Sequence, residues 1–275
     1  MTVSLTTCSV ASTPPATPSA TAIAATPSAA TPSAAPTPTP RPSFATVTSA
    51  AGVVWEATDE PGGPPVDGVM VWLRGKWPDG YATIAAIFAP SGAGPFPAVV
   101  YLHESAGLTE AQLDMARRIS IGGFIVVAGC ELSFARVQCQ RRFALRETEA
   151  AFVDLARLLP RARPDAAALI GASTGATGAL YTASTRSDIS AVVADSGVGL
   201  QYPDAPVLLL ASRADTLIGG VVEQAQTFEN ALRARGTIVE SHYYDVGGHI
   251  TLVNSQTTDD AVQRVIDFLN KYAKR

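Results

Sequence analysis

The chain has 275 residues, 47% of them hydrophobic, which is enough apolar material for a large globular core. Its formal net charge is -4, and its 20 Lys and Arg residues form no basic block, which argues against nucleic acid and against a polybasic membrane patch. No stretch after the first residues is long and apolar enough to span a membrane.

Residues 1–43 differ in composition from the remainder. They repeat Ala, Thr, Pro and Ser, carry no charge before Arg41 and offer little that could pack in a core. We expect a disordered, extended N-terminal tether over 1–43 and one folded domain over 44–275. The tether is either a working spacer or a tail without a function.

Cys8 follows Leu5-Thr6-Thr7 and so resembles a bacterial lipoprotein cleavage box. A secretory signal needs a charged start and an apolar stretch of roughly 7 to 15 residues, and the segment before Cys8 is too short for both. Either the true start lies upstream of Met1, and the protein is exported to the cell surface or beyond and tethered to a membrane through Cys8, or Cys8 is incidental. Export is the expectation, and a cytoplasmic location stays open.

The folded part begins with a predicted hairpin. Residues 68–75 and 81–90 have the character of strands, and Pro78-Asp79-Gly80 between them supplies turn chemistry. Short apolar strands then alternate with amphipathic helices. The expected strands are 97–104, 123–130, 166–172, 189–197, 205–215 and 237–246, and the expected helices are 109–122, 143–159, 175–184, 221–236 and 259–275.

This alternation predicts an α/β class: a mostly parallel, doubly wound sheet with helices on both faces. The link between strands 189–197 and 205–215 is too short for a cap domain. Ligands of such sheets collect at the carboxyl ends of the strands, so polar residues there are the candidates for a site.

Ser173 lies between Gly171 and Gly175, where a buried strand is followed by a helix. A sharp strand-to-helix turn of the pattern G-x-S-x-G raises a nucleophilic serine and needs small neighbours. The alternative is an ordinary helix N-terminus capped by Ser or Thr.

A serine nucleophile needs a base, and the base needs an acid to orient it. His249 follows the last strand, where Gly247 and Gly248 allow a turn, and is the candidate base. The other histidines are less suitable, since His242 lies within a strand and His103 precedes the first helix.

Asp215, at the end of strand 205–215, is the candidate acid. Asp195, at the end of the preceding strand, is the alternative. The order Ser173, Asp215, His249 is the order found in α/β-hydrolases.

A tetrahedral intermediate also needs two N–H donors. We expect these from the backbone of Thr174, at the start of the helix, and of Ser105, in the loop after strand 97–104.

Residues 97–132, "PAVVYLHESAGLTEAQLDMARRISIGGFIVVAGCEL", resemble the dienelactone hydrolase family of α/β-hydrolases, and the resemblance extends over about residues 68–275. It implies that His103 and Glu104 line the site with Gly171 and Gly175. That family has a cysteine nucleophile where this chain has Ser173, which leaves the role of Glu104 open. Arg136, Arg141 and Arg142 do not match its substrate-binding arginines, so dienelactone itself is not the expected substrate.

Two further cysteines, Cys130 and Cys139, form either a local disulfide, which an exported protein would keep, or two unpaired thiols. The histidines are not spaced with acids or cysteines as zinc ligands are, and no cofactor or metal is expected.

The function expected from these residues is a serine hydrolase that cleaves small or extended carboxylic esters through an acyl-enzyme. The alternatives are an acyltransferase that uses the same triad and a surface binding module without catalysis.

Overall fold

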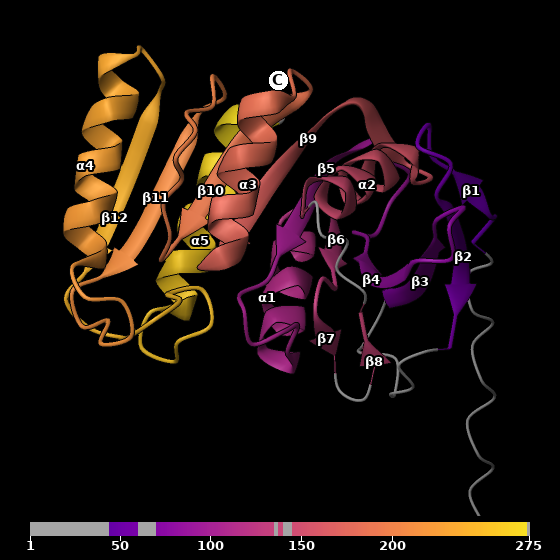
Figure 1. Ribbon diagram of the computed structural model, residues 1–275, viewed down its shortest axis with the longest axis horizontal. Helices are drawn as coiled ribbons and strands as arrows, with labels where there is room; N and C mark the ends of the chain where they lie inside the picture. The colour runs from indigo at the N-terminus through magenta and orange to yellow at the C-terminus, as the bar shows by residue number, and fades with distance from the viewer. Residues whose placement is uncertain (1–43, 60–69, 135–136, 140–144, 274–275) are drawn as a thin grey trace, which may run out of the picture. The chain divides into compact units, whose positions relative to one another are not determined.

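The computed structural model describes residues 44–59, 70–134, 137–139 and 145–273 (Figure 1). The expected tether over 1–43 lies outside the described residues, and so do Cys8, Arg136, Arg141 and Arg142.

One mixed sheet of ten described strands forms the centre of the folded domain. Its order is β1-β2-β3-β4-β6-β5-β9-β10-β11-β12; the pairs from β1 to β6 are antiparallel and those from β6 to β12 are parallel. The strands are β1 (Val47–Thr48), β2 (Val54–Thr58), β3 (Met70–Lys76), β4 (Ala82–Phe88), β5 (Phe96–Leu102), β6 (Ile125–Gly129), β9 (Ala162–Ala172), β10 (Ile189–Asp195), β11 (Val207–Ser212) and β12 (Val239–Tyr244). The expected hairpin is the β3–β4 pair, and the expected parallel strands are all present.

Helices cover both faces of the sheet, as a doubly wound fold requires (Figure 1). They are α1 (Glu110–Ile121), α2 (Leu145–Leu158), α3 (Thr174–Thr185), α4 (Val221–Ala234) and α5 (Thr258–Tyr272). Side chains of α1 and α5 pack into one core layer, and side chains of α2, α3 and α4 pack into the other. The connection from β10 to β11, residues 196–206, contains no described helix or strand, so no cap domain arises there.

The structure adds strands that the sequence pattern did not indicate. β1 and β2 extend the antiparallel end of the sheet, and β7 (Ser133–Phe134) pairs with β8 (Val137–Gln138) in a separate small hairpin. Trp55 of β2 is fully buried, and its ring lies where a Cβ on Gly75 would be. Tertiary packing against β3, rather than an alternating pattern, therefore holds β2 in the sheet.

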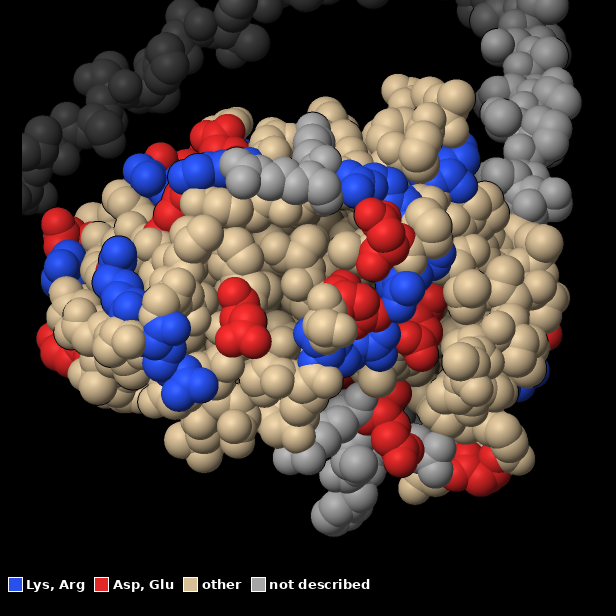
Figure 2. Space-filling view, turned by 90° about the horizontal axis from the view of Figure 1, so that it is seen from above, with Lys and Arg blue, Asp and Glu red and all other residues tan. Residues whose placement is uncertain are grey.

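Acidic and basic side chains are interspersed on the face seen in Figure 2, without an extended region of one sign. Opposite charges also pair directly, since Arg186 lies 2.9 Å from Asp154 and 2.6 Å from Asp188. No helix in the described part of the chain has the length and apolarity needed to cross a membrane.

The crossing from β9 to α3 is packed backbone against backbone. A Cβ added at Gly171 would lie 2.1 Å from the carbonyl oxygen of Gly175, and one added at Gly175 would lie 2.2 Å from that of Leu102 in β5. Backbone atoms held in a sheet and a helix cannot move aside as a flexible side chain can. Both glycines are therefore required by close approach.

We predict that Gly175→Ala lowers the free energy of unfolding by about 1–3 kcal/mol, because its methyl group overlaps the end of β5. Urea denaturation measures the change. Gly219→Ala is the matched control, since a Cβ there meets nothing within 4 Å. Equal stability of the two variants would contradict the close contact.

Candidate active site

The parallel strands end at one edge of the sheet, and the candidate site residues follow these ends. Ser173 comes directly after β9, Asp195 ends β10, Asp215 follows β11, and the loop after β12 carries His249. Segments far apart in the sequence are thereby brought to the edge where open α/β sheets bind ligands.

Ser173 occupies a strained turn between β9 and α3. Its φ is 52° and its ψ is -114°, a conformation that side-chain-bearing residues rarely adopt. Its N–H donates to the carbonyl of Asp195 at 2.8 Å, which fixes the turn against β10. Although Ser173 stands at the N-cap position of α3, its hydroxyl makes no capping hydrogen bond. The capping alternative therefore does not account for this side chain.

His249 and Asp215 form a hydrogen-bonded pair, with Nδ1 2.7 Å from Oδ2. The Asp215 side chain is 0% exposed and that of His249 is 13% exposed. The other carboxylate oxygen, Oδ1, accepts the N–H groups of Leu217 at 2.8 Å and Ile218 at 3.1 Å. Since a carboxylate oxygen accepts, Nδ1 carries a proton, and in the neutral imidazole Nε2 is then the nitrogen with the lone pair.

Burial by itself raises the pKa of Asp215, but the hydrogen bonds from His249, Ile218 and Leu217 outweigh it and hold this pKa below its ordinary value. Asp215 is therefore an anion at neutral pH and can stabilise a positive imidazole.

Asp195, the alternative acid, has different partners. Its carboxylate accepts hydrogen bonds from Ser196, from the N–H and hydroxyl of Thr251 and from the N–H of Leu252, at 2.9–3.1 Å. Ser196 Oγ in turn accepts the N–H of Ile250 at 3.1 Å. Of the two carboxylates that the sequence left open, Asp215 contacts the imidazole, and Asp195 holds the segment that follows His249.

Ser173 and His249 lie at the same edge of the sheet. Ser196 lines a pocket together with Ser173, and it binds the residue next to His249. No hydrogen bond joins Ser173 Oγ to His249, both of them described residues. Such bonds are often long without a ligand and shorten when the substrate binds.

A pocket of about 200 Å³ lies beside Ser173. Its described lining comes from the start of α3, the segment after β10 and the start of α4, and none of these residues is charged. The lining residues are Ser173, Thr174, Thr177, Ser196, Gly197, Val198, Ile218, Val221 and Gln224.

Two backbone N–H groups near Ser173 make no hydrogen bond to a described residue. Thr174 is the first residue of α3, where the helix leaves its N–H groups unpaired. Ser105 lies in a turn closed by the N–H of Gly107 and the carbonyl of Glu104, at 3.2 Å. The contact between Gly175 and the end of β5 brings the two segments together.

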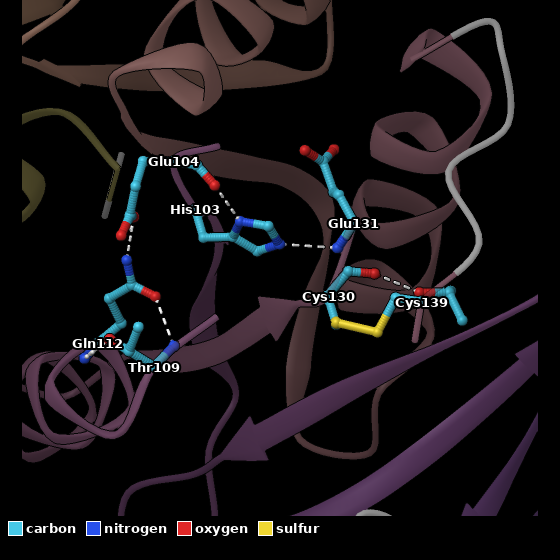
Figure 3. The surroundings of a disulfide bond; sticks show 8 residues. His103, Glu104, Thr109, Gln112, Cys130, Glu131 and Cys139 are labelled. Carbon is cyan, nitrogen blue, oxygen red and sulfur yellow. Dashed lines mark hydrogen bonds between the residues drawn. A yellow bond between two sulfur atoms is a disulfide. The ribbon is translucent and has the colours of Figure 1, made fainter. Parts of the chain in front are cut away.

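Glu104 links the β5–α1 loop to the start of α1. Gln112 Nε2 donates to its carboxylate, and Gln112 Oε1 accepts the N–H of Thr109 at 2.8 Å (Figure 3). Burial raises the pKa of Glu104, while Gln112 and the charge of His249 offset part of that rise. The carboxylate is thus within electrostatic reach of His249.

The other two histidines, His103 and His242, contact groups other than Ser173 and Asp215. His103 is buried and bonds on both ring nitrogens to backbone groups (Figure 3). His242 lies in β12, 3.8 Å from Asp260 and edge-on to Tyr244. No group of three His, Cys, Asp or Glu side chains suited to a metal ion occurs among the described residues.

Cys130 and Cys139 form a disulfide, with Cα atoms 5.9 Å apart (Figure 3). Of the two states that the sequence allowed, the structure has the bonded one. The disulfide closes the segment that leaves β6 and carries β7 and β8.

The polar residues that hold the site together could not be recognised in the sequence. Ser196, Thr251 and Gln112 lie in no motif, and their roles depend on partners 54, 56 and 8 positions away. The short polar run after β10, Asp195-Ser196-Gly197, was the one signal available.

No family model matches the sequence, and neither does any curated protein. Solved structures, by contrast, match the structure of this chain. A dienelactone hydrolase-like promiscuous phosphotriesterase from metagenomic libraries is 17% identical, with a TM-score of 0.59 over 74% of this chain and 100% of its own. An esterase from Pyrococcus furiosus is 17% identical, with a TM-score of 0.58 over 74% of this chain and 90% of its own.

A dienelactone hydrolase from Anabaena variabilis is 18% identical, with a TM-score of 0.54 over 70% of this chain and 93% of its own. Likeness at these identities concerns the arrangement of strands and helices. The chain therefore has the α/β-hydrolase fold, in the form found in dienelactone hydrolases.

Proposed function

We propose that the protein is a serine hydrolase that cleaves carboxylic esters through an acyl-enzyme. The observation that carries the proposal is the buried Asp215–His249 pair at the sheet edge where the strained turn presents Ser173. The esterases and dienelactone hydrolases that share the fold support the same class of reaction.

In the proposed mechanism, His249 Nε2 takes the proton of Ser173 as Oγ attacks the ester carbonyl carbon. Asp215 stabilises the imidazolium, and the N–H groups of Thr174 and Ser105 bind the oxyanion. Collapse breaks the bond to the alcohol oxygen, which receives the proton from His249. Water, activated by the same base, then releases the acid and restores the serine.

The pocket beside Ser173 supports an ester with a small uncharged group as the substrate. Its volume of about 200 Å³ is below the roughly 300–1,000 Å³ of pockets that hold drug-sized ligands. Val198, Ile218 and Val221 give it apolar walls, and its described lining offers no cation for a carboxylate. A short aliphatic acyl group fits these properties better than a carboxylate-bearing lactone.

Ser173→Ala should lower the turnover of p-nitrophenyl acetate at least about 10⁴-fold without changing the fold, because the nucleophile is lost. Release of p-nitrophenol and far-UV circular dichroism give the two readouts. A fluorophosphonate probe should label the wild-type chain and not the variant.

Two other results would favour the alternatives. A folded wild-type chain that neither turns over the ester nor reacts with the probe would indicate a binding module. Release of p-nitrophenol that requires an added alcohol acceptor would indicate an acyltransferase.

Asp215→Asn should reduce kcat by about 10³- to 10⁴-fold with little loss of stability, since the imidazole loses its anionic partner and its tautomer. Asp195→Asn is the matched comparison. It should cost about 1–3 kcal/mol of unfolding free energy, because an amide NH₂ faces N–H donors, and it should retain more activity. A larger loss of kcat in folded Asp195→Asn would reverse the assignment of the acid.

Ile218→Trp should lower the ratio of kcat/KM for p-nitrophenyl butyrate to that for the acetate by about 10-fold or more, because the indole takes the space of the longer acyl chain. Leu200→Trp is the control, since Leu200 is 91% exposed and follows the pocket residue Val198 by two positions without lining the pocket. An unchanged ratio in Ile218→Trp would mean that the acyl group binds elsewhere.

A further inference from the structure

The β5–α1 loop, residues 103–108, carries the N–H of Ser105 that the proposed function places in the oxyanion hole. Thr174, the other donor, is fixed by the helix it begins. Ser105 is exposed and lies in a two-residue turn, so its direction depends on what holds the two ends of the loop. Both ends are bonded to the segment that the Cys130–Cys139 disulfide closes.

His103 holds the first end. Its ring is buried, with Nε2 2.9 Å from the N–H of Glu131 and Nδ1 2.6 Å from the carbonyl oxygen of Glu104 (Figure 3). A backbone N–H can only donate and a carbonyl can only accept. Nε2 is therefore the acceptor and Nδ1 the donor, so the ring is neutral and has one tautomer.

Ser133 holds the second end. Its carbonyl accepts the N–H of Leu108 at 2.8 Å. A Cβ added to Gly107 would lie 2.6 Å from Ser133 Oγ and 2.8 Å from its carbonyl oxygen, so the two backbones are in close contact. Glu131 and Ser133 thus form hydrogen bonds to the loop on both sides of Ser105, at His103 and at Leu108.

The disulfide fixes the segment that bears these two contacts. Cys130 is anchored to the sheet, because its N–H donates to the carbonyl of Ile84 at 3.0 Å and its carbonyl accepts the hydroxyl of Thr83. Cys139 is bonded to Cys130 through the disulfide, and the N–H of Cys139 donates to the carbonyl of Leu132 at 2.8 Å. Both cysteines are buried.

We propose that His103 and the Cys130–Cys139 disulfide are positioning groups for catalysis: together they aim the N–H of Ser105 at the oxyanion. The inference rests on the proposed ester hydrolysis. It assigns His103 a task different from proton transfer, since both ring nitrogens are engaged with the backbone. It also makes full activity depend on the oxidised state of the two cysteines.

The first test is the double variant Cys130→Ala/Cys139→Ala. Loss of one oxyanion donor costs about 10²- to 10³-fold in kcat, so a misdirected donor should cost about 10- to 100-fold, with KM changed less than about 2-fold. A butyl trifluoromethyl ketone forms an adduct with Ser173 that carries an oxyanion. Its inhibition constant should rise by the same factor by which kcat/KM falls.

The second test keeps the disulfide and changes the ring. His103→Ala removes both hydrogen bonds and should reproduce the loss of kcat and the weaker ketone inhibition. His103→Gln should restore part of both, because its amide offers one acceptor and one donor. This pair decides the question if the double cysteine variant does not fold.

Arg186→Ala controls for general loss of stability. It breaks the ion pairs with Asp154 and Asp188. Asp188 precedes the amino end of β10, whereas the site lies at the carboxyl ends of the strands, so kcat and ketone inhibition should be unchanged. If the cysteine and His103 variants fold and have the kcat of the wild type, the inference is overturned. The proposed function is still upheld in that case, because the wild-type enzyme turns over the ester. A fall in kcat without weaker ketone inhibition would also overturn the inference. A wild-type chain without turnover would instead remove the proposed function.

Discussion

The contact between the start of α3 and the end of β5 is the constraint on which the site depends. Gly175 lies so close to the carbonyls of Leu102 and His103 that no side chain fits between them. This contact places the N-terminus of α3, and with it Ser173 and Thr174, beside the loop that contains Ser105. The nucleophile and the proposed Thr174 donor thus take their position relative to the β5–α1 loop from one backbone contact, and the two glycines of the motif make it possible.

Two carboxylates at neighbouring strand ends are distinguished by their partners. Every described hydrogen bond to the Asp195 carboxylate comes from Ser196 or from the segment 251–252, so this side chain is used to hold the loop that carries His249. Asp215 uses one oxygen for backbone N–H groups and leaves the other for the imidazole. A strand-end position therefore identifies a candidate acid, and the remaining hydrogen bonds decide whether it faces the base.

Most of the fold could be predicted from the sequence, because apolar runs and amphipathic periods record burial directly. The strands from β3 onward that form the sheet, and all five helices, were expected close to their observed bounds. β2 was not, since Trp55 is held by its contact with Gly75 in another strand. Ser173, Asp215 and His249 could be proposed because each follows a predicted strand, whereas Ser196 and Thr251 support the site through bonds between distant segments that leave no local pattern.

The disulfide makes the proposed site depend on the redox conditions around the protein. A helix N-terminus holds Thr174 by the regular geometry of the backbone, but a turn of exposed residues has no such support and must be held from outside. Here that support passes through His103 and Ser133 to a segment closed by Cys130 and Cys139. Cytosolic thiols are kept reduced, and disulfides persist in oxidising compartments. The inferred dependence of the Ser105 donor on the sulfur bridge therefore favours a site of action outside the cytosol, in line with the export expected from the residues around Cys8, which stays a prediction.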